Sequence, residues 1–233
     1  YKQVTVYDFV AGAMENTTLS VFNEGLMCNH EDIADKNFEE DAIIAHELVH
    51  QWFGDLVTCE SWSQLTLNES FATYGEYLWI ENWKGKDDAA VQWYNKYQTY
   101  LREFTYKKVD PIVQNYYETP KELFDGHRYS KGAIVLHLLR KYIGDEAFFD
   151  GIQIYLQQNA FQSAEVTHLK LAFEKITGQD LNWFFNQWYY NPGHPIVDLK
   201  YRYDSIHKEI ILDIYQKQDQ HPNAQMPYHK ILL

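Results

Sequence analysis

The segment His46-Glu47-Leu48-Val49-His50 lies within residues 41–54, where apolar residues recur at the spacing of a helix. Two histidines four residues apart on a helix are separated by about 40° around its axis, with Cβ atoms roughly 6 Å apart. Both imidazoles can therefore bind one metal ion. Glu47 is rotated away from direct ligation and can hold a water molecule and take its proton. We predict that one helical turn supplies two zinc ligands, His46 and His50, and a general base.

A third ligand follows on the next expected helix, at residues 64–83. Glu69 comes after His50 with 18 intervening residues, so two antiparallel helices joined by a short loop would bring it to the metal. Two histidines and one glutamate leave the fourth position for water, which is typical of a catalytic zinc site, and we expect one Zn²⁺ per chain. Glu76 lies on the same helical face as Glu69. It either orients His46 or His50 from outside the ligand set or forms a salt bridge at the rim.

Composition limits the class of protein. The 233 residues are 45% apolar and 23% charged, which predicts a globular chain of one large domain, or one domain and part of another. The net charge of −13 disfavours binding to phosphate backbones, so we expect no nucleic-acid partner. No run of 18 apolar residues occurs, so we expect a soluble chain with no membrane span. The compartment, cytoplasmic or exported, and the oligomeric state stay open.

The start of the chain and its two cysteines say less about the class of protein. The chain begins at Tyr1 without Met, and we expect a piece of a longer protein whose flanking domains are missing. Two cysteines, Cys28 and Cys59, are too few for a disulfide framework. They either pair with each other or remain thiols.

The pattern along the chain predicts a mostly helical α+β fold. Residues 2–10 and 19–22 are rich in β-branched and aromatic types and are expected to be strands, compatible with an edge hairpin. We expect Thr167 and Asp180 to cap the last two helices. The expected helices are at 41–54, 64–83, 88–104, 129–142, 145–157, 167–178 and 180–190.

The sequence changes character after residues 191–193, Asn-Pro-Gly. Residues 196–203 and 210–215 alternate between apolar and polar types, which predicts a β-hairpin. The hairpin would open a second, all-β unit that is too short to be a complete domain. We therefore expect a helical domain at 1–194 and a partial β domain at 195–233.

Three separated motifs together resemble the M1 family of zinc aminopeptidases, aminopeptidase N-like members of the gluzincins. The first motif is the His46–His50 segment with Leu67-Asn68-Glu69. The second, Gly12-Ala13-Met14-Glu15-Asn16, lies 29 residues before His46 and is similar to the family's exopeptidase signature. The third, Tyr129-Ser130-Lys131-Gly132-Ala133, resembles its catalytic tyrosine segment. The resemblance covers about residues 1–195, and more weakly the segment that follows.

The resemblance implies a thermolysin-like zincin domain with a small N-terminal sheet, followed by the start of a β-sandwich. It implies that a zinc-activated water, with Glu47 as general base, hydrolyses the N-terminal residue of peptides. Glu15 would bind the free α-amine of the substrate through a charge-assisted hydrogen bond. Tyr129 would stabilise the oxyanion. The implied substrate-binding residues are Gly12, Ala13, Met14, Glu15 and Asn16.

Three alternative functions depend on particular residues. A bifunctional epoxide hydrolase–aminopeptidase of the same family usually carries Gly-Gly-Met-Glu-Asn, and Ala13 disfavours it. A metalloendopeptidase is disfavoured by Glu15, because an internal peptide bond offers no ammonium. A non-catalytic peptide-binding fragment would be favoured by loss of the base, a ligand or the tyrosine, and all are present. Aromatic residues at 74–79 and 116–117 are candidates for the substrate pocket or for the core. Activity of the chain without flanking domains stays open.

Overall fold

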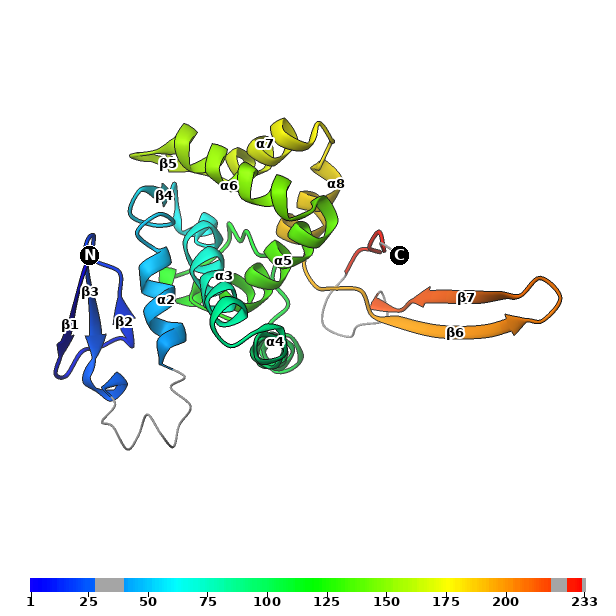
Figure 1. Ribbon diagram of the computed structural model, residues 1–233, viewed down its shortest axis with the longest axis horizontal. Helices are drawn as coiled ribbons and strands as arrows, with labels where there is room; N and C mark the ends of the chain where they lie inside the picture. Colours follow the sequence, from blue (N-terminus) through cyan, green and yellow to red (C-terminus); the bar gives the residue numbers. More distant parts are fainter. Residues whose placement is uncertain (28–39, 219–225, 232–233) are drawn as a thin grey trace.

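The computed structural model describes residues 1–27, 40–218 and 226–231. A small sheet formed by β1 (Lys2–Val6), β2 (Ala13–Met14) and β3 (Leu19–Asn23) stands beside the first long helix (Figure 1). Its order is β1-β3-β2, with β1 parallel to β3 and β2 antiparallel to β3. The edge hairpin expected from residues 2–10 and 19–22 is therefore wrong. The chain reverses once before β2 and once after it, so the first and last strands run the same way.

The first strand is also shorter than predicted. It ends at Val6 rather than residue 10, and Asp8 has a φ of 57°, in the left-handed region. This conformation interrupts the extended backbone and turns the chain toward β2.

Most of the remaining chain is helical, as predicted. A second short sheet joins β4 (Val57–Cys59) to β5 (Gln162–Ala164) in parallel. Short 3₁₀ turns occur at Glu24–Leu26, Trp62–Gln64 and Pro120–Leu123. The α-helices are α2 (Asp41–Val49), α3 (Thr66–Trp83), α4 (Lys86–Tyr106), α5 (Gly132–Ile143), α6 (Asp145–Asn159), α7 (Val166–Thr177) and α8 (Asn182–Phe185).

Two predicted helices contain π-helical turns. The expected helix at 129–142 begins within a π turn, η4 (His127–Lys131), and continues as α5. The expected helix at 180–190 divides into α8 and a second π turn, η5 (Asn186–Tyr190). Side-chain chemistry does not signal this change, because a π turn differs only in the reach of its hydrogen bonds.

The predicted caps also differ. Helix α7 begins one residue before Thr167, and its N-cap is Glu165, whose backbone N–H donates to Nδ1 of His168. The expectation that Thr167 caps this helix is therefore wrong. Asp180 accepts a hydrogen bond from the N–H of Asn182, the first residue of α8, but the N-cap of that helix is Leu181, so the expectation that Asp180 caps it is also wrong.

Helix α3 is the centre of the core. Every residue from Thr66 to Tyr77 is buried, because α2, α4 and α5 surround this helix. Gly75 allows the close approach of α2: a Cβ at this position would lie 2.4 Å from Cγ2 of Val49. The polar side chains of α3 are therefore enclosed between helices, where they need partners of their own.

The predicted C-terminal hairpin is confirmed. Strands β6 (Val197–Asp204) and β7 (Glu209–Gln216) pair antiparallel and extend away from the helices (Figure 1). Many of their large apolar side chains are exposed, Tyr201 by 77% and Ile210 by 67%. Within the described ranges, no helix is long and apolar enough to cross a membrane.

The packing of α2 on α3 predicts the effect of Gly75→Ala. We expect overpacking against Val49 to cost about 1–3 kcal/mol, which exceeds the roughly 1 kcal/mol gained from the better helix propensity of Ala. Urea denaturation should show a lower free energy of unfolding. In the double variant with Val49→Ala, the loss should be smaller than the sum of the two single losses. Additive losses would contradict the contact. Asn82→Ala, on the exposed end of α3, is the control.

Candidate metal centre

Helices α2 and α3 bring the three predicted ligands together. Nε2 of His46 lies 3.3 Å from Oε2 of Glu69, and Nε2 of His50 lies 3.4 Å from the same oxygen. Ligand atoms on a tetrahedral zinc, with bonds of about 2.0–2.1 Å, are roughly 3.3 Å apart. Oε2 of Glu69 is buried and has no hydrogen-bond donor among the described residues. The spacing and this unpaired oxygen both fit a zinc ion held by His46, His50 and Glu69.

The outer nitrogens of both imidazoles have fixed partners. Nδ1 of His50 lies 2.9 Å from the carbonyl oxygen of Phe53, and Nδ1 of His46 lies 2.9 Å from Oε1 of Glu76. Both partners accept hydrogen bonds, so each Nδ1 carries the proton and each Nε2 presents a lone pair to the centre. Glu76 is only 7% exposed. Glu76 therefore lies against His46, as the first alternative expects, and its other oxygen forms an ion pair with Lys96, as the second expects.

Charge in the cluster is balanced between acids and imidazoles. Burial lowers the pKa of His46, but Glu69 and Glu76 outweigh this effect and raise the pKa to about 10. Burial raises the pKa of Glu69, but the neighbouring imidazoles of His46 and His50 outweigh it and lower the pKa to about 2. The acids thus favour positive charge between the helices. A divalent cation can supply that charge in place of imidazole protons.

Glu47 is placed beside the ligands without joining them. Its side chain is 6% exposed, and its Oε2 has no hydrogen-bond partner in the described structure. Burial raises the pKa of Glu47 to about 7, against the opposing effect of the two histidines. A carboxylate with a pKa in this range can both take and return a proton near neutral pH.

Glu15 and Tyr129 approach the same centre from two other elements. A carboxylate oxygen of Glu15, one of Glu47 and a ring nitrogen of His50 lie within 4.8 Å of one another. The ring of Tyr129, on the π turn η4, is nearly parallel to the imidazole of His46, with centroids 6.0 Å apart and 6° between planes. Burial, followed by the charge of Glu69, raises the pKa of Tyr129 far above its usual value. Its hydroxyl therefore stays protonated and can donate.

The loop that carries Glu15 is tied to the end of α2 by Gln51. The Gln51 amide donates to the carbonyl oxygen of Glu15 at 2.9 Å and accepts from the N–H of Thr18 at 2.6 Å. Sequence reasoning gave Gln51 no role, because a residue that fixes a distant loop has no local pattern. The only available signal was its position directly after His50.

The ligand cluster, Glu47, Glu15 and Tyr129 line one open cavity of about 820 Å³. Strand β2, which is an edge strand of the three-stranded sheet, forms one border of this cavity. Of the aromatic pocket candidates, Tyr117 lines the cavity, whereas Tyr74 and Tyr77 are buried in the core. Sequence reasoning missed Trp62 and Phe124, whose rings contact each other with centroids 5.7 Å apart. The predicted residues on the cavity wall are Gly12, Ala13, Met14, Glu15, His46, Glu47, His50, Glu69 and Tyr129.

One predicted substrate-binding residue lies outside the cavity wall. Asn16 follows Glu15 in the loop but is not part of the cavity wall, and its carbonyl oxygen accepts from the N–H of Leu19. Cys59 lines the cavity, and burial raises the pKa of its thiol to about 11. Cys28 lies outside the described residues, so the pairing of the two cysteines stays untested.

A mostly helical fold with a His-His-Glu cluster facing a cavity is typical of a metallopeptidase. A family model described as the peptidase family M1 domain matches residues 1–188. The chain therefore belongs to peptidase family M1.

The chain is also similar to proteins that are named as aminopeptidases. The chain is 33% identical over 214 residues to a probable aminopeptidase 1 of Sulfurisphaera tokodaii, covering 87% of this chain and 26% of the relative. It is 33% identical over 234 residues to a glutamyl aminopeptidase of Rattus norvegicus, covering 95% and 24%. The chain thus spans about a quarter of the length of these curated relatives.

Solved structures share the fold. An M1 zinc metallopeptidase of Deinococcus radiodurans, in a mutant form bound to a Tyr-Ser-Ala substrate, matches with a TM-score of 0.64 and 27% identity, over 81% of this chain and 38% of that one. Aminopeptidase A of Legionella pneumophila matches with a TM-score of 0.77 and 22% identity, over 93% and 24%. The second likeness concerns the fold alone.

The ligand geometry predicts the effect of Glu69→Ala on zinc binding. Loss of one of three protein ligands should raise the dissociation constant for zinc by at least about 100-fold, since removal of even an outer partner typically costs 10–100-fold. Competition with a chromogenic chelator measures this change. Glu60→Ala removes a carboxylate from the same cavity wall and should leave the zinc affinity near that of the unmodified chain. Equal affinities for all three proteins would contradict the assignment.

Proposed function

We propose that this chain is the catalytic part of a zinc-dependent aminopeptidase, which removes the N-terminal residue from peptides. The observation that carries the proposal is the position of Glu15. Its carboxylate lies within 4.8 Å of Glu47 and His50, on the wall of the cavity that contains the ligand cluster. An ammonium bound there would place the first peptide bond of the substrate, rather than a later one, beside the cluster.

Each remaining residue has a chemical task in this proposal. When bound by His46, His50 and Glu69, zinc lowers the pKa of a coordinated water and polarises the scissile carbonyl. Glu47 takes the proton of the attacking water and passes it to the leaving amine. The hydroxyl of Tyr129 donates a hydrogen bond where negative charge develops on the carbonyl oxygen.

The edge strand β2 supports the same orientation of substrate. Its residues Ala13 and Met14 pair with β3 on one side, and the chain from Ala11 to Glu15 borders the cavity. An extended peptide can add to such an edge through main-chain hydrogen bonds. The peptide main chain would then run along Gly12 and Ala13 toward Glu15.

We further propose a division of the chain at residue 194. Residues 1–194 would form a thermolysin-like catalytic domain, and residues 195–233 would begin a β-sandwich. The exposure of apolar side chains on both β6 and β7 supports the second part, because an isolated two-stranded hairpin is marginally stable in water.

The requirement for a free amine gives the decisive test of the proposed function. The full-length parent protein is assayed on an aminoacyl-arylamide panel and on the N-acetylated forms of the same substrates. We expect turnover of the free forms and a loss of at least about 100-fold in kcat/KM on acetylation, since the charged partner of Glu15 is removed. Equal turnover of the two forms would favour an endopeptidase and overturn the proposal.

A further inference from the structure

Two charged residues of α4 contact residues that lie next to the candidate metal centre. Lys96 and Glu103 are seven residues apart, two helical turns, and therefore lie on the same side of α4. Lys96 contacts a residue of α3, and Glu103 contacts the start of the π turn η4. Neither residue lines the substrate cavity. Lys96 instead reaches His46 through Glu76, and Glu103 reaches Tyr129 through the backbone that precedes it.

Lys96 completes a chain of polar contacts that ends at a zinc ligand. Its Nζ lies 2.7 Å from Oε2 of Glu76, and Oε1 of Glu76 lies 2.9 Å from Nδ1 of His46. Gln92, one turn earlier on α4, donates to Oε2 of Glu76 at 3.3 Å. Glu76 is buried, and the ammonium of Lys96 lies directly against its carboxylate and balances its charge. Without Lys96, this carboxylate would keep an uncompensated charge and a looser position.

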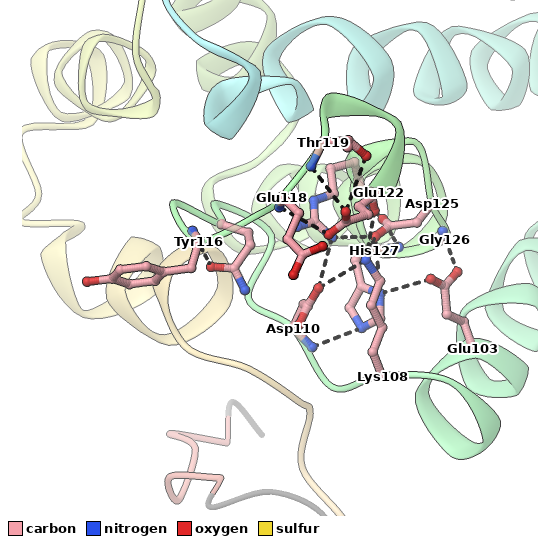
Figure 2. Close-up of polar contacts among 12 residues, drawn as sticks. Glu103, Lys108, Asp110, Tyr116, Glu118, Thr119, Glu122, Asp125, Gly126 and His127 are labelled. Atoms are coloured by element: carbon pink, nitrogen blue, oxygen red, sulfur yellow. Dashed lines mark hydrogen bonds and ion pairs between the residues drawn. The ribbon is translucent and has the colours of Figure 1, made fainter.

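Glu103 holds the turn from which Tyr129 projects. Its Oε2 accepts a hydrogen bond of 2.6 Å from the N–H of Gly126, and its Oε1 lies 3.7 Å from Nδ1 of the fully buried His127 (Figure 2). A Cβ at Gly126 would lie 2.7 Å from Oε2 of Glu103, so the carboxylate fits closely against the glycine. These two contacts anchor the two residues that begin the π turn.

The same turn is held on its other side by a network of ion pairs. Asp125 accepts a backbone hydrogen bond from His127, and its carboxylate contacts the side chain of Lys108 (Figure 2). It also accepts from the N–H of Arg128 and forms an ion pair with the Arg128 side chain. Glu103, Asp125 and His127 together have the spacing of a metal site. However, Lys108 and Arg128 already bring two positive charges to Asp125, so a further divalent cation would be repelled. The network is therefore better suited to holding the backbone than to binding a metal.

We propose that Lys96 and Glu103 are positioning residues, through which a single helix, α4, orients both the zinc ligand His46 and the oxyanion donor Tyr129. The proposal rests on the proposed function, because it assigns those two residues their tasks. It predicts that the two effects are separable: Lys96 acts on metal affinity, and Glu103 acts on turnover.

Lys96 is tested by zinc affinity, which needs no turnover. We expect Lys96→Met to raise the zinc dissociation constant about tenfold, the low end of the effect of losing an outer partner. Lys96→Arg should restore most of the affinity, because it keeps the charge against Glu76. Lys86→Met removes an exposed lysine at the start of α4 and should have no effect. Affinity of Lys96→Met within twofold of the unmodified protein overturns this half. An unmodified protein that binds no zinc instead refutes the proposed function.

Glu103 is tested by a double-mutant cycle with Tyr129 in the full-length parent protein. We expect Glu103→Ala to lower kcat about tenfold with little change in KM and in zinc affinity, because the interaction of Tyr129 forms only in the transition state. In a Tyr129→Phe background, Glu103→Ala should cost less than about twofold more. Glu103→Gln, which keeps an acceptor for the N–H of Gly126, should recover part of the loss.

The double-mutant cycle also distinguishes a failure of the inference about Glu103 from a failure of the role proposed for Tyr129. An equal loss from Glu103→Ala in both backgrounds shows that Glu103 does not act through Tyr129, and overturns this half of the inference. If Tyr129→Phe alone leaves kcat unchanged, the proposed role of Tyr129 is wrong instead. If Glu103→Ala does not fold, the same cycle is run with Glu103→Gln. We then expect a smaller loss of kcat, and only in the protein that retains Tyr129.

Discussion

The close packing of α2 on α3 is the constraint on which the candidate site depends. Helix α2 carries His46 and ends directly before His50, and α3 carries Glu69. Gly75 allows the two helices to approach closely enough for the ligand atoms to meet. A protein interior is packed as densely as an organic crystal, so a displacement of one helix is transmitted to its neighbours rather than absorbed. The ligand geometry is thus a property of the core and not of a flexible loop.

The cost of this arrangement is a set of buried charges, and the structure meets it by pairing them. Glu69 faces two imidazoles, and Glu76 lies between His46 and Lys96. Unpaired, each carboxylate would disfavour the folded state by several kcal/mol. The surrounding helices therefore supply the candidate zinc ligands and also the charges that allow those side chains to be buried.

Sequence reasoning succeeded where the information was local. His46 and His50 are one helical turn apart, Glu69 is on the next helix, and the alternation of residues 196–215 is a direct sign of the β6–β7 hairpin. It failed where the outcome depends on distant segments. The parallel pairing of β1 with β3 depends on where the chain turns between them, and the contact of Lys96 with Glu76 depends on how α4 lies across α3. No spacing within one segment encodes either.

The π turn η4 has a consequence for how this site tolerates change in chain length. The N–H of Gly132 bonds to the carbonyl oxygen of His127, five residues back, so the turn holds one more residue than an α-helix over the same path. Removal of one residue here would let an ordinary helix form over the same path, and Tyr129 would leave it in a different direction relative to α5. Substitutions alter this site by degrees, whereas a single deletion in η4 would change the direction in which the tyrosine points.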